Sequence, residues 1–199
     1  MALTHLFFDI GGVLGTNGWD REQRRAAATH FSIDPESLDR RHKEVVAAWE
    51  EGRMPWDEYL DFTVFHDARP FGRDEFKQFV LALSQPFEQS VAAARRLREQ
   101  GTLIYTLNNE SDELNRHRIA RFGLAPIVHG FLSSCWLGVR KPARAIYERA
   151  LAITSADPAS SLFVDDREQN LSPAHALGMR TMQFTFGDDM AEKLRTADC

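Results

Sequence analysis

Apolar and polar positions divide the chain into two kinds of segment. Residues 3–8 are mostly apolar without alternation, which is typical of a parallel strand covered on both faces. Further β-prone runs predict strands at 102–107, 128–133, 162–164 and 181–186. The segments around them predict helices at 87–100, 111–122, 144–153, 170–177 and 188–195. Alternating strands and helices indicate right-handed crossovers and an α/β fold, with a Rossmann-like parallel sheet between helices.

The segment between the first strand and residue 87 has a different pattern. It is almost wholly helical, with Asp34 as an N-cap and Pro35 at the first helical position of one helix. We predict helices at 20–31, 35–52, 55–66 and 73–84. The predicted domains are therefore an α/β core, residues 1–15 and 87–199, and a helical cap, residues 16–86. An insertion just after the first strand lies above the carboxyl end of the sheet, where it can act as a lid.

Composition and charge narrow the class of protein. The 199 residues suffice for one well-buried domain or one domain with a smaller insert, and 43% hydrophobic with 27% charged residues indicates a soluble globular protein. A net charge of −5 without a basic block argues against nucleic acid or an anionic membrane as partner. No spanning segment or secretory signal is visible, and Cys135 and Cys199 lie in no metal pattern, so we expect a cytoplasmic protein with reduced thiols. Nothing indicates an oligomeric state.

An acidic residue followed by two glycines ends the first predicted strand. Asp9 comes directly after the apolar run, and a carboxylate there is costly to bury unless it is paired or binds a metal. Gly11 and Gly12 allow the backbone to approach a ligand closely. This short pattern equally fits an ordinary glycine turn with an exposed Asp.

Polar residues also follow the later strands. Asn108 and Asn109 can hold an oxyanion together with backbone N–H groups, or simply form a turn or helix cap. Lys141, shortly before a predicted helix, can neutralise a phosphate oxygen, or be a solvated loop lysine. Asp165 and Asp166 follow an apolar run, and their mutual repulsion favours a bound cation over an exposed turn. In a parallel sheet these groups converge on one rim.

This order of groups resembles the four motifs of the haloacid dehalogenase superfamily. The most specific matches are Phe8-Asp9-Ile10-Gly11-Gly12-Val13-Leu14, Gly138-Val139-Arg140-Lys141-Pro142 followed by Ala145-Ile146-Tyr147, and Phe163-Val164-Asp165-Asp166 followed by Asn170 and Gly178. Within the superfamily the chain is most similar to small phosphatases with a helical cap between the first two motifs, such as bacterial glucose-1-phosphate phosphatases.

The resemblance implies a Mg²⁺-dependent phosphomonoesterase acting on a small phosphorylated metabolite. Asp9 would be the nucleophile that forms an aspartyl-phosphate. Mg²⁺ would be held by Asp9, the Gly11 carbonyl, Asp166 and, directly or through another group, Asp165. Lys141 and the Asn108 amide would hold the phosphoryl oxygens, and Asn109 and Gly12 complete the predicted substrate-binding set.

Two positions depart from the superfamily pattern. Gly11 stands where many of these phosphatases carry an acid, although glycine also occurs there in the phosphatases that the chain most resembles. General acid–base help is typically worth about 10²–10⁴-fold, so activity is expected to be slow or limited to good leaving groups, and phosphomutase chemistry is disfavoured. The second motif usually has Ser or Thr. Asn108 aligns with it, while Thr106, one strand period earlier, is the alternative; we favour Asn108.

Two other functions compete with the phosphatase. A catalytically silent relative that binds a phosphorylated ligand or a protein is favoured by Gly11, but has no need of desolvated carboxylates. A haloacid dehalogenase attacks carbon without a metal, so the paired acids Asp165 and Asp166 would be unhelpful.

Overall fold

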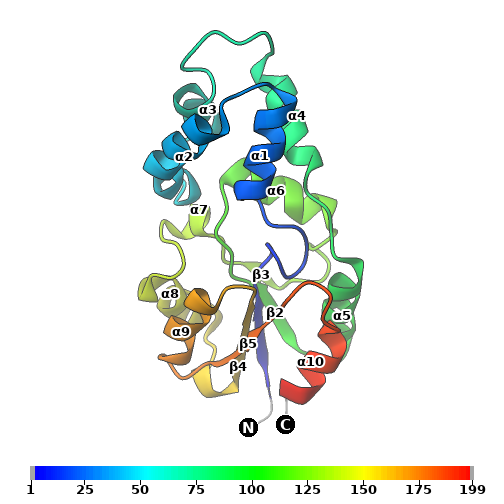
Figure 1. Ribbon diagram of the computed structural model, residues 1–199. Helices are drawn as coiled ribbons and strands as arrows, with labels where there is room; N and C mark the ends of the chain where they lie inside the picture. The colour runs from blue at the N-terminus through cyan, green and yellow to red at the C-terminus, as the bar shows by residue number, and fades with distance from the viewer. Residues whose placement is uncertain (1–2, 198–199) are drawn as a thin grey trace.

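A parallel sheet forms the centre of the molecule. The computed structural model describes residues 3–197, and within them five parallel strands form one sheet in the order β3-β2-β1-β4-β5 (Figure 1). The strands are β1 (His5–Phe8), β2 (Leu103–Thr106), β3 (Gly130–Phe131), β4 (Ser161–Asp165) and β5 (Arg180–Gln183). Phe8 at the end of β1 is in register with Thr106 of β2 and Val164 of β4. The polar residues that follow these three strands therefore emerge together, and the predicted α/β fold is confirmed.

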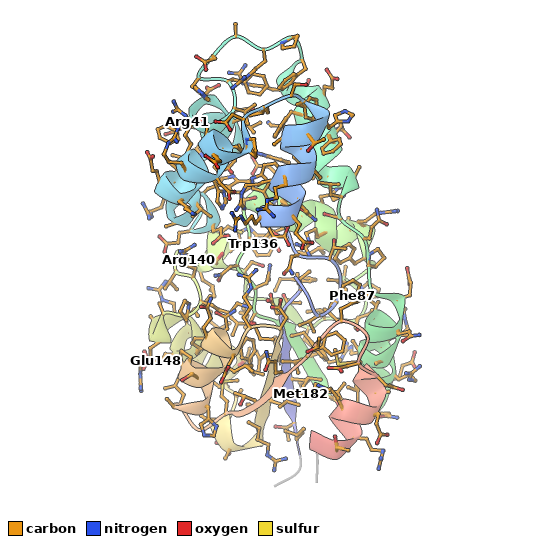
Figure 2. The ribbon with its side chains drawn as sticks, in the orientation of Figure 1. Arg41, Phe87, Trp136, Arg140, Glu148 and Met182 are labelled. Carbon is orange, nitrogen blue, oxygen red and sulfur yellow. The ribbon has the colours of Figure 1, made fainter. Side chains whose placement is uncertain are left out.

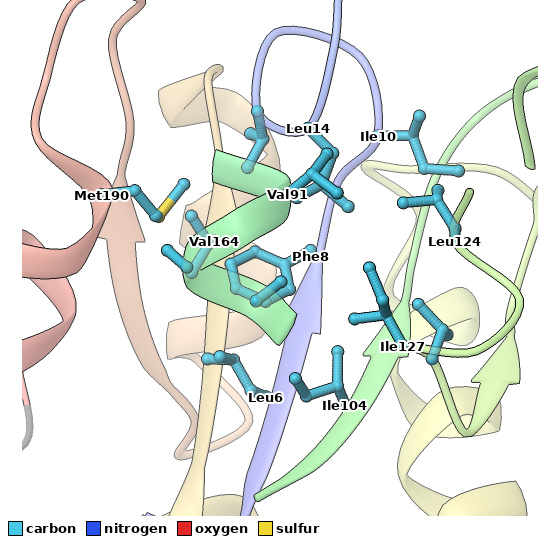
Figure 3. Packing of buried hydrophobic residues seen from close by; sticks show 14 of the residues in the cluster. Leu6, Phe8, Ile10, Leu14, Val91, Ile104, Leu124, Ile127, Val164 and Met190 are labelled. Carbon is cyan, nitrogen blue, oxygen red and sulfur yellow. The ribbon is translucent and has the colours of Figure 1, made fainter. Parts of the chain in front are cut away.

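Helices cover both faces of the sheet. α5 (Glu88–Glu99) and α10 (Met190–Ala197) lie on one side, and α8 (Arg144–Thr154) and α9 (Glu168–His175) on the other (Figure 1). Leu6 and Phe8 pack with Val91 of α5 (Figure 3). Phe7, between them, packs on the opposite face with Tyr147 of α8. Strand β1 lacks alternation because both faces are buried, as predicted.

Four further helices lie beyond the carboxyl ends of the strands (Figure 1). They are α1 (Arg21–His30), α2 (Pro35–Glu50), α3 (Trp56–Thr63) and α4 (Arg73–Ala82). Asp34 caps α2 and Pro35 begins it, as predicted. The helices share an apolar cluster that includes Trp49 and Trp56, together with Leu114 of α6 (Asp112–Arg121). Because α6 follows β2, this packing ties the helical layer to the sheet.

The chain enters and leaves the helical layer through two paired connectors. Thr16 N–H donates to the Gln85 carbonyl, and Phe87 N–H donates to the Leu14 carbonyl (2.9 Å each). Gly15 and Pro86, which lie between the residues of these two hydrogen bonds, form an isolated antiparallel β-bridge. A Cβ at Gly15 would lie 2.4 Å from the Phe122 ring, so the close pairing requires glycine there. We propose that the two domains divide at these connectors, with residues 16–86 as the cap.

Several boundaries differ from the sequence prediction. Strand 128–133 is reduced to Gly130–Phe131, because β3 is an edge strand paired with β2 alone. Strand 181–186 becomes Arg180–Gln183, since its partner β4 ends opposite Gln183 and Phe186 is then 74% exposed. A short helix α7 (Ser134–Leu137) and a 3₁₀ turn (Pro158–Ser160) were not predicted.

Two smaller sequence predictions concern cysteine and membrane. Cys135 is a free thiol, whereas Cys199 lies outside the described residues. In the part of the chain that the structure describes, no helix has the length and apolar character needed to cross a bilayer.

Candidate active site

Three carboxylates meet at the carboxyl ends of β1 and β4. Asp9 follows β1 directly, Asp165 ends β4 and Asp166 comes next; one oxygen from each lies within 4.8 Å of the others. Lys141 Nζ lies 3.1 Å from Asp9 Oδ2 and 2.6 Å from Asp165 Oδ2. The structure thus brings together residues that the sequence spreads over more than 150 positions. Lys141 and the partly exposed Arg167, whose Nε lies 3.8 Å from Asp166 Oδ1, are two cations beside three carboxylates, so the ionised cluster carries excess negative charge.

Burial and the neighbouring charges together set the pKa values of Asp9 and Lys141. Asp9 is 8% exposed, and its Oδ1 accepts a hydrogen bond from the Ile10 N–H at 2.8 Å. Burial raises the pKa of Asp9 to about 7, with a smaller contribution from Asp165 and Asp166 and against the lowering effect of Lys141. Burial lowers the pKa of Lys141, but the carboxylates around it prevail and raise that pKa. Further positive charge would stabilise the ionised cluster.

The two adjacent aspartates have different surroundings. Asp165 is fully buried and accepts hydrogen bonds from Lys141 Nζ, the Arg167 N–H and Asn170 Nδ2. Asp166 Oδ1 is buried but has no hydrogen-bond partner among the described residues, and Arg167 Nε is 3.8 Å away. An orphaned carboxylate oxygen beside a second carboxylate suits a hard divalent cation, which takes oxygen ligands. Asp165 thus has donors on both of its oxygens, whereas Asp166 Oδ1 has only the distant Arg167 as a neighbouring cation.

The two glycines after the first strand have separate places. Gly11 lines the cavity above the cluster. Gly12 has φ +72°, and a Cβ there would lie 2.5 Å from the Asp166 carboxyl carbon. The Gly12 N–H donates to the Gly15 carbonyl at 2.8 Å. Gly12 thus makes room for Asp166, and its N–H is used within the turn; its predicted place in the substrate-binding set stays a prediction.

Of the two candidates for the second motif, Asn108 lies on the cavity wall. Its amide oxygen accepts from Ser133 Oγ at 2.9 Å and its Nδ2 donates to Asn115 Oδ1 at 3.0 Å, which leaves one N–H. Thr106 is fully buried in β2, and its hydroxyl has no hydrogen-bond partner within residues 3–197. This placement favours Asn108, and the Ser133 and Asn115 contacts fix its orientation.

Asn109 holds the backbone of Lys141. Its Oδ1 accepts from the Lys141 N–H at 2.8 Å and its Nδ2 donates to the Lys141 carbonyl at 2.9 Å. The side chain predicted to bind substrate is thus engaged with the loop that carries the lysine. No sequence signal links two residues 32 positions apart in this way.

Asp9 and Lys141 of this cluster line a cavity of about 410 Å³ between the sheet and the helical layer. Its walls are mainly polar and include Arg24, His42 and Glu50 of the helical layer. Arg140 lies between the two parts of the molecule (Figure 2) and forms an ion pair with Glu50, with Nη1 2.7 Å from Oε2. Small polar ligands fit such walls better than long apolar ones.

A neutral hydrogen-bonded chain supports the cavity wall formed by the helical layer. Trp19 Nε1 donates to the Tyr59 hydroxyl at 2.6 Å, and that hydroxyl lies 2.8 Å from His42 Nδ1. Burial, and to a lesser extent Arg24, lower the pKa of His42 to about 3, so the imidazole is uncharged at neutral pH. All three tryptophans of the predicted cap, Trp19, Trp49 and Trp56, belong to the apolar cluster of the helical layer, and Trp19 also lines the cavity.

Comparison with curated proteins finds a phosphatase. A model of the haloacid dehalogenase-like hydrolases matches residues 3–178. The sesquiterpene phosphatase astK of Aspergillus oryzae is 28% identical over 102 residues, which are 51% of this chain and 52% of that protein. The match thus spans about half the length of this relative.

Comparison with solved structures finds the same fold over almost the whole chain. The haloacid dehalogenase family enzyme BT-2542 from Bacteroides thetaiotaomicron has a TM-score of 0.86 at 20% identity, covering 98% of this chain and all of that one. Another structure of that enzyme, in complex with magnesium and inorganic phosphate, has a TM-score of 0.81. A dehalogenase structure has a TM-score of 0.66 at 21% identity, and the match covers 91% of this chain and 84% of the dehalogenase chain. Because the family model matches residues 3–178, most of this chain, the chain belongs to the haloacid dehalogenase-like hydrolases and is a hydrolase.

Proposed function

We propose that the protein is a Mg²⁺-dependent phosphomonoesterase that acts on a small phosphorylated metabolite through an aspartyl-phosphate at Asp9. The excess buried negative charge of Asp9, Asp165 and Asp166 beside Lys141 carries this proposal. Keeping such a cluster desolvated is costly without a cation. A dehalogenase or a silent binding protein has no use for it.

Asp9, the Gly11 carbonyl and Asp166 would hold Mg²⁺. The orphaned Asp166 Oδ1 supports this assignment, whereas the filled hydrogen-bonding capacity of Asp165 points to a role in holding Lys141. When bound, the ion would offset repulsion between the Asp9 carboxylate and the anionic phosphate. The magnesium and phosphate complex of BT-2542 supports the same use of the fold.

The reaction follows from the residues around Asp9. Its carboxylate attacks phosphorus, an acyl-phosphate bond forms, and the ester P–O bond breaks as the alcohol leaves. Lys141 Nζ and the remaining Asn108 N–H would hold the phosphoryl oxygens. Because Gly11 offers no acid, the departing alkoxide would take its proton from water or from another side chain, or leave unassisted. A water molecule then attacks the acyl-phosphate, releasing inorganic phosphate and free Asp9.

The cavity favours a small hydrophilic ester. Its polar walls and volume of about 410 Å³ suit a polar phosphate ester better than the hydrocarbon chain of a terpenoid. We retain the expectations of a cytoplasmic location and of no nucleic-acid or membrane partner as part of this proposal.

A substrate screen tests the function. Phosphorylated metabolites are incubated with the protein in MgCl₂ or in EDTA, and released phosphate is measured; 2-haloacids are tested in parallel for halide release. We expect metal-dependent phosphate release that is lost in Asp9→Asn. Halide release in EDTA, or no phosphate release from any ester, would overturn the proposal.

A further inference from the structure

Arg24 of α1 has one unpartnered nitrogen in the wall of the cavity. The residue is 7% exposed; its Nε donates to Asp39 Oδ1 at 2.8 Å, and its Nη1 donates to the Trp19 carbonyl at 2.6 Å. Nη2 has no acceptor within residues 3–197, and Arg24 lines the cavity. Because the other two nitrogens hold the planar guanidinium in place, Nη2 is left as a fixed, charged donor for a ligand.

His42 of α2 supplies a second unpartnered donor. The Trp19 indole nitrogen can only donate, so the Tyr59 hydroxyl accepts from it and donates its own hydrogen to His42 Nδ1. A neutral imidazole that accepts at Nδ1 carries its hydrogen on Nε2. His42 is 8% exposed and lines the cavity, and its Nε2 has no acceptor among the described residues. The hydrogen-bonded chain therefore fixes the imidazole as an Nε2–H donor.

The two donors lie close together on neighbouring helices. Asp39, which accepts from Arg24, stands three residues before His42 on α2, so the two side chains lie on the same face of that helix. Trp19 joins the donors a second time, because its carbonyl accepts from Arg24 and its ring nitrogen begins the chain that ends at His42. One ligand group can therefore meet both donors.

The charges around this pair of donors leave room for an anion. Arg21 Nε lies 3.2 Å from Asp39 Oδ2, so two guanidinium groups share that one carboxylate. Asp20, which also lines the cavity, is the N-cap of α1, where the helix dipole offsets its charge. Glu50 lies about 12 Å beyond the donors along α2 and is paired with Arg140. The carboxylates of the wall thus leave Arg24 Nη2 without an acceptor.

We propose that Arg24 and His42 form a subsite for a carboxylate on the alcohol part of the phosphate ester, so that the substrate is a phosphorylated hydroxy acid. The inference rests on the proposed function. A carboxylate accepts one hydrogen bond from each donor and brings no hydrogen of its own. A hydroxyl group would need an acceptor as well, and neither free nitrogen is one.

A matched pair of esters tests the subsite. 3-Phosphoglycerate and glycerol 3-phosphate share a carbon skeleton, with a carboxylate in the first where the second has a hydroxymethyl group. Phosphate release in MgCl₂ gives kcat/KM for each, and we expect wild type to favour 3-phosphoglycerate by at least about 10-fold. The readout is the ratio of the two values, because damage to the fold lowers both alike.

The arginine variants test the charged donor. Arg24→Met should lower the ratio by about 10-fold, while Asp39 stays paired with Arg21. Arg24→Lys keeps a cation beside Asp39 but lacks the fixed second donor, so it should lower the ratio as well and serves if Arg24→Met does not fold. The matched control is Arg41→Lys on α2 (Figure 2), whose side chain donates to the Phe62 carbonyl, and its ratio should be unchanged.

His42→Phe tests the neutral donor, and it should lower the ratio by less than Arg24→Met because the lost donor is uncharged. An unchanged ratio in either variant, or an equal loss in Arg41→Lys, would overturn the subsite. So would a wild type that hydrolyses p-nitrophenyl phosphate but does not favour 3-phosphoglycerate, and the proposed function would then stand. No phosphate release from any ester would overturn the proposed function and the subsite with it.

Discussion

Two groups of buried charges lie close together in this molecule but differ in composition. At the junction with the helical layer, Arg118 Nη1 lies 2.8 Å from Glu110 Oε2, and the two side chains are 1% and 5% exposed. That pair has one cation for one anion. At the rim of the sheet, Lys141 faces three carboxylates.

The difference separates structural charges from functional ones. The junction pair joins one cation to one anion, and Arg118 also donates to the Thr16 carbonyl and so ties the connector to α6, while its Nε has no hydrogen-bond partner among the described residues. The rim cluster is incomplete and is stabilised only when positive charge is added. The balance of buried charge thus distinguishes a structural ion pair from a candidate binding site, and the following variants test that distinction.

Asp9→Asn should have the largest effect. Because an amide is a poor nucleophile, kcat/KM for phosphate release should fall by at least about 10³-fold. The free energy of unfolding in EDTA should stay the same or rise, since one surplus negative charge is gone. Urea denaturation and phosphate release measure both. Activity above a few per cent of wild type would show that Asp9 is not the nucleophile, and a clear loss of stability would show that the rim charges are balanced.

Arg118→Met should have the opposite profile, with loss of stability. Removing one partner of a buried ion pair typically costs about 3–5 kcal/mol. The matched control on the same helix is Arg116→Met, whose ion pair with Asp112 is mostly exposed and is therefore expected to change stability little. Urea unfolding at pH 7.5 measures both variants. Similar losses of unfolding free energy in the two variants would mean that the Arg118–Glu110 ion pair does not stabilise the fold.

Mg²⁺ should stabilise the rim and leave the junction unchanged. At a free concentration 100 times Kd, a ligand specific for the folded state adds about 2.7 kcal/mol to the free energy of unfolding. We expect this increment in wild type and in Arg118→Met, but not in Asp166→Ala. Thermal unfolding with and without MgCl₂ measures it. A full increment in Asp166→Ala would exclude Asp166 as a metal ligand.

The smallest effect concerns His42, a buried titratable group kept neutral. Its pKa falls from 6.5 to about 3 on folding, so below pH 6.5 the unfolded chain binds a proton that the folded protein excludes. Stability is therefore lost as pH falls, by at most about 1.4 kcal/mol per pH unit from this group. Because Arg24 and Asp39 also act on His42, the comparison is with His42→Asn, which keeps them. Urea unfolding at pH 7, 6 and 5 should give a steeper decline for wild type; parallel declines would mean that His42 is protonated in the fold.

Much of the fold could be predicted because the strands at the centre of the sheet carry a strong signal. Strands β1 and β4 are buried on both faces, so their sequences are continuous apolar runs. The edge strands have weaker patterns, and both were predicted too long. The helical layer was visible through Asp34 and Pro35, but its packing against Leu114 of α6 involves no local pattern.

Within the candidate site, residues that follow apolar strands could be predicted and their supports could not. Asp9, Asp165 and Asp166 stand out in the sequence because a carboxylate that follows a buried apolar run is costly to desolvate unless it is paired or binds a metal. Asn109 holds the backbone of Lys141, 32 positions along the chain, and an asparagine in a loop is most simply a turn residue. Only the folded structure shows which polar groups that amide meets.

The paired connectors make the helical layer a replaceable module. Since the chain leaves the core at Gly15 and returns at Pro86 beside it, the inserted segment can change in length or identity without moving the ends of the core. The rim of the sheet and the cavity wall above it can then diversify separately. A transplanted module would still have to supply its own wall for the cavity, because Arg24, His42 and Glu50 belong to the exchanged segment.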